Sequence, residues 1–280
     1  MTRIRIPLLL LLGWLLALPA QALELPRTAP VPGGIVVLDL GPANRPRPEV
    51  RYRQRRVMVV RHHGRWKAVL GIPLSARPGR AALEVRQGKH RRRLSFRVRP
   101  KTYPVQRLHI RDRHKVNPDA AELARIRRES RRIHADLRHW RARPPRRLRL
   151  HWPVHGIVSS TFGLRRILNG QPRHPHSGLD IAVPAGTPIR APAPGRVVDT
   201  GHFFFDGKTV FLDHGEGMVT MYGHMSRIDV KPGQWVRTGQ VLGAVGQTGR
   251  ATGPHLHWGV SLNDARVDPR LLLATPASHP

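Results

Sequence analysis

The sequence contains no cysteine. Disulfide bonds, thiolate zinc ligands and acylation of an N-terminal cysteine are therefore excluded, and any metal ion must be held by imidazole and carboxylate groups. Acidic residues are also scarce: 17 Asp and Glu accompany 49 Lys and Arg, which leaves a formal net charge of +32 at pH 7. Beyond residue 22 no apolar run approaches the length of a membrane span, so the rest of the chain is expected to be soluble or at most peripheral.

The apolar run that is present lies at the start of the chain. Arg3 and Arg5 precede a largely apolar stretch over residues 6–18, and Ala20-Gln21-Ala22 supplies the small residues of a cleavage site. This order predicts a signal peptide, residues 1–22, that is cleaved after Ala22, and hence an exported, periplasmic protein. A retained membrane anchor is the alternative, because the run is only a little shorter than the roughly 20 residues of a spanning helix.

The basic charge is concentrated in the first half of the chain. Residues 1–150 hold 37 Lys or Arg against 9 Asp or Glu, whereas residues 151–280 hold 12 against 8. Basic surfaces bind phosphate backbones, but an exported protein is kept apart from nucleic acid, so we expect no nucleic acid partner. Anionic envelope polymers or the membrane surface fit this half better. A merely solvated basic surface is the alternative.

Residues 30–100 have the pattern of a small all-β domain. The segment around His63-Gly64 predicts a β-hairpin that turns at these two residues. We assign residues 23–104 to an N-terminal β-domain, a small β-sandwich. Short runs rich in β-branched residues alternate there with glycine or proline, at residues 35–40, 57–61, 66–71, 82–86 and 94–98.

Residues 105–150 predict a basic helical connector. Asn117 is expected to be the N-cap and Pro118 the first helical residue of one long helix of about 25 residues. This helix should stop before Pro144. An apolar stripe along the helix must pack against another part of the protein. Its members recur at helical spacing, at Leu123, Ile126, Ile133, Leu137 and Trp140.

Residues 151–280 predict a second β-domain, because short apolar runs alternate with frequent glycine. Two motifs in it carry groups that could bind a metal. His176 and Asp180 are four residues apart in HSGLD, and His255 and His257 are two apart in HLHWGV. Side chains two apart on a strand share a face. Catalytic zinc sites usually use three nitrogen or oxygen ligands and leave a fourth position for water, so two separate strands could converge on one ion.

These motifs together resemble the M23 family of zinc metallopeptidases, the lysostaphin-like or LytM-type endopeptidases of peptidoglycan. The resemblance covers nearly all of residues 151–270, and the N-terminal β-domain and helix resemble those of longer Gram-negative members more loosely. Around His176-x-x-x-Asp180 and His255-Leu256-His257 stand SSTFGLR at 159–165, MYGHMS at 221–226, GQVLGAVGQTG at 239–249 and GPHLHWGV at 253–260.

The resemblance implies a mainly β fold and a zinc site. The C-terminal domain, residues 151–280, would be an antiparallel β catalytic domain of the LytM type with a duplicated hybrid motif. One Zn²⁺ ion would be held by His176, Asp180 and His257. His224 and His255 would be the catalytic residues, one taking a proton from water and the other stabilising the oxyanion.

The implied function is zinc-dependent hydrolysis of the peptide cross-links of peptidoglycan, by a D,D-endopeptidase that acts in cell-wall remodelling. A catalytically silent wall-binding or activator module of the same fold is the alternative. Such modules typically lose metal ligands, whereas all three ligands and both accessory histidines are present here.

Overall fold

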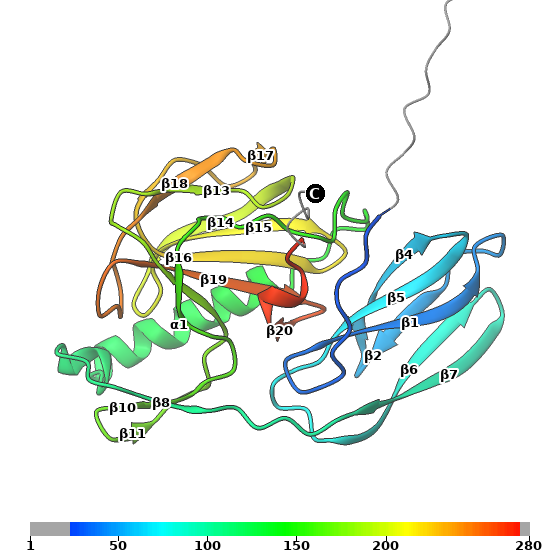
Figure 1. Cartoon of the computed structure of the whole chain (residues 1–280), viewed down its shortest axis with the longest axis horizontal. Coiled ribbons are helices and arrows are strands. Elements are labelled where there is room, and N and C mark those ends of the chain that lie inside the picture. Colours follow the sequence, from blue (N-terminus) through cyan, green and yellow to red (C-terminus); the bar gives the residue numbers. More distant parts are fainter. Residues whose placement is uncertain (1–22, 275–280) are drawn as a thin grey trace, which may run out of the picture.

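The computed structural model describes residues 23–274. The predicted signal peptide, residues 1–22, lies outside the described residues, as do residues 275–280. Within the described range the chain is mainly β; its single α-helix comes between two β-rich parts in chain order and lies beside the C-terminal one (Figure 1). The predicted fold class is therefore confirmed. No helix in this range has the length and apolar character needed to cross a bilayer.

The N-terminal part consists of two small antiparallel sheets. One has the strand order β1-β5-β4 and the other β3-β2-β6-β7, and apolar side chains of both form one buried core. The predicted hairpin is present, because β4 pairs with β5 and His63 and Gly64 have positive φ values of 44° and 69°. The strands are β1 (Ile35–Pro42), β2 (Glu49–Tyr52), β3 (Arg55–Arg56), β4 (Met58–His62), β5 (Arg65–Gly71), β6 (Gly79–Gln87) and β7 (His90–Val98).

The C-terminal part is built on one ten-stranded sheet. Its main path runs β17-β14-β15-β16-β19-β12-β9, and β13, β18 and β20 pair alongside it. β19 lies between β16 and β12, so side chains from three strands can reach one place. The elements are β9 (Ile157–Ser160), β12 (Gly178–Ala182), β13 (Pro188–Arg190), β14 (Gly195–Phe203), β15 (Gly207–Gly215), β16 (Met218–Ile228), β17 (Trp235–Val236), β18 (Val241–Val245), β19 (His255–Leu262), β20 (Ala265–Val267) and the 3-10 helix η2 (Pro269–Leu271).

The connector adds a strand of its own to the C-terminal part. β8 (Val105–Leu108) pairs in parallel with β10 (Arg165–Leu168), which also pairs with β11 (Gln171–Pro172). A short 3-10 helix, η1 (Arg113–Lys115), follows β8. The chain therefore runs along one side of the C-terminal part before it enters α1 (Figure 1).

The helix is shorter than predicted. α1 spans Ala120–Leu137 and its N-cap is Asp119, so the prediction of Asn117 as N-cap was wrong and the predicted length was too great. Asp119 caps the helix because it forms a capping box. Its carboxylate accepts a hydrogen bond from the backbone N–H of Glu122 at 2.8 Å, and the Glu122 carboxylate accepts one from the backbone N–H of Asp119 at 2.9 Å.

Only the C-terminal half of α1 buries the predicted stripe. Leu137 is buried and Ile133 packs beside it, whereas Leu123 near the other end is 41% exposed. The helix contacts β14 and β16, so it covers one side of the C-terminal sheet. The sheet residues in this small core are Phe203, Phe211, Val219 and Met221.

The two β-rich parts share buried contacts. Met58 and Val69 of the N-terminal part belong to the same apolar core as Leu262 of β19. The side chain of Asn263 accepts a hydrogen bond from the Gly71 backbone N–H at 2.8 Å and donates one to the Gly71 carbonyl at 3.1 Å. A Cβ atom added at Gly71 would lie 2.9 Å from the carbonyl oxygen of Leu262. The backbone at Gly71 therefore packs closely against Leu262 and Val267, with no room for a side chain of its own.

Candidate metal centre

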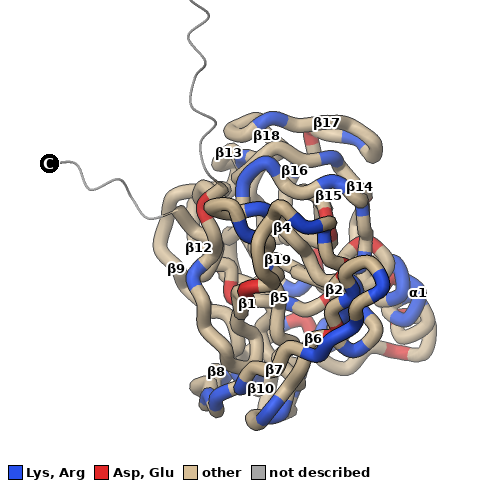
Figure 2. The backbone as a smooth tube through the Cα atoms, turned by 90° about the vertical axis from the view of Figure 1, so that its right-hand side faces the viewer, with Lys and Arg blue, Asp and Glu red and all other residues tan. Residues whose placement is uncertain are grey.

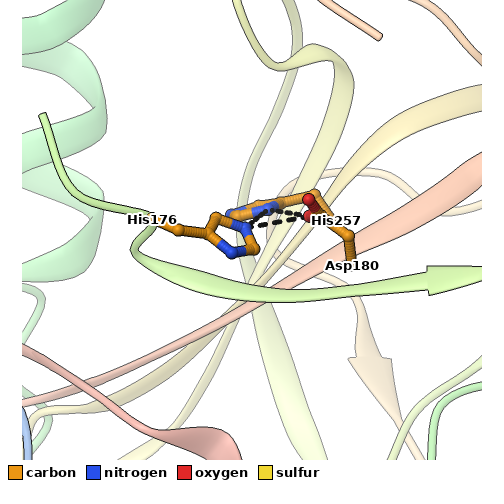
Figure 3. A group of neighbouring side chains, drawn as sticks. All are labelled: His176, Asp180 and His257. Carbon is orange, nitrogen blue, oxygen red and sulfur yellow. Dashed lines mark hydrogen bonds and ion pairs between the residues drawn. The ribbon is translucent and has the colours of Figure 1, made fainter. Parts of the chain in front are cut away.

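The register of two strands brings the predicted ligands together. β12 and β19 are antiparallel, and Asp180 lies directly opposite His257. His255 lies two residues from His257 on the same strand and therefore shares its face. His176 comes from the loop before β12, and its ring points toward the other two side chains (Figure 3). A loop and two strands thus meet at one point.

The three ligand atoms form a close triangle. His176 Nε2 lies 3.0 Å from Asp180 Oδ1 and 3.1 Å from His257 Nδ1, and these last two atoms are 2.8 Å apart. Ligand atoms about 2.0–2.1 Å from a tetrahedral zinc ion lie roughly 3.3 Å from one another, so a small expansion of this triangle would accommodate the ion. All three side chains are buried. The residues fit one Zn²⁺ ion, with the fourth position left open.

The hydrogen bonds of Nδ1 determine which ring nitrogen of His176 can bind a metal. Nδ1 donates a hydrogen bond to the carbonyl oxygen of Thr161 at 2.8 Å. Because Nδ1 carries the proton, Nε2 keeps its lone pair and faces the other ligands. Nδ1 also lies 3.2 Å from Ser160 Oγ, which donates to Gln106 Oε1 of β8 at 3.2 Å. The connector is therefore linked to the metal ligand through one hydroxyl group.

The second oxygen of Asp180 has a partner of its own. Arg166 Nη2 donates to Oδ2 at 2.8 Å, which leaves Oδ1 for the histidines. Burial by itself would raise the pKa of Asp180, but hydrogen bonds with His176 and His257 outweigh burial and lower this pKa well below its usual value. Burial also lowers the pKa of His176. An ionised carboxylate and a neutral imidazole are the forms that bind a metal.

His224 reaches the site through an irregularity in β16. Its φ of 61° is a left-handed value that costs energy in any residue but glycine. The pairing of β15 and β16 shifts register here, and the His224 N–H donates to the carbonyl of Asp206 at 2.7 Å. Such a bulge redirects a side chain. The centroid of the His224 ring lies 4.6 Å from that of His255 and 6.0 Å from that of His257.

His224 and His255 share one protonation pattern. His224 Nδ1 donates to the carbonyl of Thr248, and His255 Nδ1 donates to the carbonyl of Gly253, both at 2.8 Å. In the neutral form of each ring the lone pair is therefore on Nε2. Burial, followed by the neighbouring histidines, lowers the pKa of His224 to about 3, so this ring is neutral at physiological pH. His255 Nε2 lies 3.9 Å from Asp180 Oδ1. Both imidazoles can accept a proton beside the metal site.

Three residues that support the site were missed by the sequence analysis. Arg166 directly follows the SSTFGLR segment, Thr248 lies within GQVLGAVGQTG, and Ser160 lies within SSTFGLR. Their position in or beside these segments was the only available signal. No spacing predicts their contacts, because Arg166 reaches Asp180 from β10, a strand that does not pair with β12.

Another group of metal-binding residue types lies at the start of α1. His114, Asp119 and Glu122 have atoms within 4.8 Å of one another. Asp119 and Glu122 are already engaged in the capping box, and His114 Nδ1 lies 3.2 Å from Glu122 Oε2. We therefore assign this group to the helix terminus.

Comparison with known proteins identifies the family. Residues 174–269 match the sequence profile of peptidase family M23, and residues 28–101 match that of the peptidase family M23 N-terminal domain. A crystal structure of a Pseudomonas aeruginosa chain assigned to peptidase M23 is 48% identical with a TM-score of 0.75, over 88% of this chain and 96% of that chain. The chain belongs to peptidase family M23. The resemblance predicted from its motifs is confirmed.

Two curated proteins show which activities occur among relatives of this M23 peptidase. The DD-carboxypeptidase/endopeptidase Mpg of Neisseria meningitidis serogroup B is 40% identical over 131 residues, which are 44% of this chain and 29% of Mpg. The peptidoglycan DD-endopeptidase ShyA of Vibrio cholerae is 45% identical over 102 residues, which are 36% of this chain and 24% of ShyA. The chain therefore matches less than one third of the length of each relative.

Proposed function

We propose that this M23 peptidase is a zinc-dependent D,D-endopeptidase that hydrolyses peptide cross-links of peptidoglycan in cell-wall remodelling. The observation that carries the proposal is the buried triangle of His176, Asp180 and His257, with the rings of His224 and His255 beside it. The DD-endopeptidase activity named for Mpg and ShyA supports the choice of substrate. The bond we propose is the amide between D-alanine and diaminopimelate.

The buried triangle would hold the zinc ion. A bound zinc ion polarises a carbonyl group and lowers the pKa of water to about 7. Asp180 would contribute a negatively charged oxygen, and His176 and His257 would contribute ring nitrogen atoms. Arg166 and Thr161 hold two of these side chains from behind, so the ligands are oriented before the metal arrives.

His224 and His255 would carry out the proton transfer of the reaction and stabilise its negative charge. One Nε2 atom accepts a proton from water as the water oxygen bonds to the carbonyl carbon. That imidazolium then gives its proton to the amide nitrogen as the C–N bond breaks, so the products are a carboxyl group and an amine. The other ring would stabilise the negative charge that develops on the carbonyl oxygen when its own Nε2 carries a proton, which it could then donate in a hydrogen bond.

The proposal predicts loss of metal and of turnover when one ligand is removed. Zinc-loaded protein that lacks residues 1–22 should open cross-linked muropeptide dimers, and a chelator should stop the reaction. His257→Ala should reduce bound zinc from about one equivalent to near zero and abolish turnover, as measured by metal analysis and by mass spectrometry of the digest. His202→Ala, at an exposed histidine of the same part, is the control. Intact dimers after long incubation with the zinc-loaded protein would contradict the proposal.

A catalytically silent wall-binding or activator module is the second candidate function. It would hold zinc and yet leave the dimers intact. The conformation of His224 argues against this candidate. His224 has a strained backbone that brings its ring next to that of His255, and such strain is typical of residues with a functional role.

We also propose that the protein is exported to the periplasm after cleavage at Ala22, and that its domains are residues 23–104, 105–150 and 151–280. The peptidoglycan activity named for ShyA supports this location. Lys and Arg positions gather along β6, on α1 and beside β8 and β10 (Figure 2). These surfaces would attract anionic envelope polymers or the membrane surface.

A further inference from the structure

Three arginine side chains gather beside the metal site. Arg166 donates to the ligand Asp180, as described above. Arg173 follows β11, and Arg250 lies in the loop before β19. Burial, followed by the charge of Arg166, lowers the pKa of Arg250 to about 10; the charge of Asp206 opposes this shift, and the charge of Arg173 adds to it. Arg250 is therefore near enough to both other arginines for their charges to act on it.

Arg250 belongs to the loop that contacts His224, and its side chain stacks on Phe205. Its backbone N–H donates to the carbonyl of Phe205 at 2.8 Å, and its guanidinium carbon lies 4.2 Å from the centroid of the Phe205 ring. Arg250 comes two residues after Thr248, whose carbonyl accepts the proton of His224 Nδ1. Stacking on the ring fixes the guanidinium plane beside the loop that carries this hydrogen bond.

No carboxylate of the described residues forms an ion pair with Arg173 or Arg250. Their partners are neutral oxygens, of the connector for both arginines and also of Gln171 and Pro172 for Arg173. Arg250 Nη1 donates to the carbonyl of Lys115 at 3.3 Å, and Arg173 Nη2 donates to the adjacent carbonyl of Val116 at 2.8 Å. Arg173 Nη2 also contacts Asn117 Oδ1 at 3.3 Å and Gln171 Oε1 at 2.5 Å. Two adjacent carbonyl oxygens thus lie where the two oxygens of one carboxylate could be bound.

The proposed substrate carries a carboxylate in the matching position. The carbon atom that bears the amide nitrogen of the D-alanyl–diaminopimelate bond also bears a carboxylate, so this group must lie within a few ångströms of the scissile bond. A guanidinium group binds a carboxylate with two parallel, charge-assisted hydrogen bonds, which are stronger than bonds to a neutral carbonyl. A substrate carboxylate could therefore displace the connector carbonyls.

We propose that Arg250, together with Arg173 and Arg166, forms a subsite for the carboxylate next to the scissile amide. This inference rests on the proposed function and specifies its substrate: the enzyme selects an amide whose nitrogen belongs to a residue with a free carboxylate. A cross-link in which that group is blocked is then a poor substrate. In the absence of substrate, residues 115–117 occupy the subsite.

The test compares two synthetic dimers, one with the free carboxylate and one with a carboxamide in its place. Wild-type protein should show a KM for the carboxamide about 10- to 100-fold higher, the range expected for hydrogen bonds to a charged group. Arg250→Met should raise the KM for the carboxylate dimer by a similar factor and leave that for the carboxamide within about twofold. Arg250→Lys keeps the charge but loses the planar guanidinium group, so its KM for the carboxylate dimer should lie between those of wild type and Arg250→Met. Arg237→Met, at an exposed arginine of the same part, should change neither value.

A binding measurement separates this proposal from the proposed function. Zinc-loaded His255→Ala protein, with and without Arg250→Met, is titrated with each dimer by calorimetry. A preference for the carboxylate dimer that disappears with Arg250→Met supports the subsite even when no dimer is cleaved. Equal binding of both dimers overturns it. An equal rise in turnover of both dimers by Arg250→Met also overturns it, since Arg250 would then serve only to hold the connector.

Discussion

Individual hydrogen bonds decide what each side chain of the site can do. Thr161, Thr248 and Gly253 each accept the Nδ1 proton of one histidine, which makes Nε2 the atom of each neutral ring that can bind a metal or accept a proton. A change of tautomer at any of these rings would replace a lone pair by a proton. The carbonyl groups around the site are therefore as important for its chemistry as the histidines themselves.

Arg166 gives a direct test of this support. Arg166→Met should weaken zinc binding about 10- to 100-fold, the range expected for loss of a group that orients a metal ligand. The reason is that Asp180 Oδ2 loses its partner while it remains buried. Competition with a chelating dye measures the affinity. Arg165→Met removes the same charge from the exposed neighbouring position and should have little effect, so equal losses in the two variants would refute the role.

At the scale of elements, the N-terminus of α1 is well stabilised and its C-terminus is not. The capping box stabilises its N-terminus, but Asp136 lies in its last turn, where the helix dipole disfavours a negative charge. Asp136 is buried, and its Oδ2 atom has no hydrogen-bond partner. Burial, followed by the charge of Asp199, raises the pKa of Asp136 to about 7. The buried helix end therefore depends on a protonated carboxyl group.

This pKa predicts how stability responds to pH. Between the ordinary value of 3.8 and about 7 the unfolded chain loses a proton that the folded chain keeps, so the contribution of Asp136 to stability falls as pH rises through this interval. Asp136→Asn cannot ionise. Its free energy of unfolding relative to wild type should rise between pH 4.5 and 7.5, by about 1.4 kcal/mol for each tenfold difference in acid dissociation between the two states. Urea unfolding at both pH values measures this rise.

The control for this experiment is an exposed carboxylate. Arg227 lowers the pKa of Asp229 through a hydrogen bond, which is the opposite direction, so Asp229→Asn should show no rise over the same interval. A flat difference between Asp136→Asn and wild type would mean that Asp136 is ionised in the folded protein.

For the whole molecule, the N-terminal part and the peptidase part form one packed unit. They share an apolar core and the paired hydrogen bonds between Asn263 and Gly71. The connector adds β8 to the sheet of β10 and reaches the His176 contacts through Gln106. Removal of the first 150 residues would therefore expose apolar surface of the peptidase domain and also alter its metal site. Activity should be measured on the full mature chain.

The contact at Gly71 predicts a large effect from one methyl group. Gly71→Ala should lower the free energy of unfolding by about 1–3 kcal/mol, the usual cost of overpacking, because the new Cβ atom meets backbone and side-chain atoms of Leu262 and Val267 at 2.9 Å. Denaturant unfolding followed by circular dichroism measures the change. Gly253→Ala, where an added Cβ atom meets nothing within 4 Å, is the matched control. If the free energy of unfolding fell no further in Gly71→Ala than in Gly253→Ala, the contact at Gly71 would contribute little to holding the two parts together.

The sequence by itself determined which types of residue can form the candidate metal site. Absence of cysteine restricts the ligands to imidazole and carboxylate, and strand periodicity places His255 and His257 on one face. The hairpin at His63-Gly64 was also predictable, since a turn depends on neighbouring residues. These features are local, and local patterns can be read from the chain directly.

Only the tertiary structure decided which distant segments meet. The register of β12 against β19 sets Asp180 opposite His257, and the parallel pairing of β8 with β10 brings the connector to the site. The left-handed conformation of His224 and the contact of Arg166 with Asp180 depend on these pairings. Spacing along the chain does not encode them, because packing and hydrogen bonding between segments far apart in sequence select one register among several that the local pattern allows.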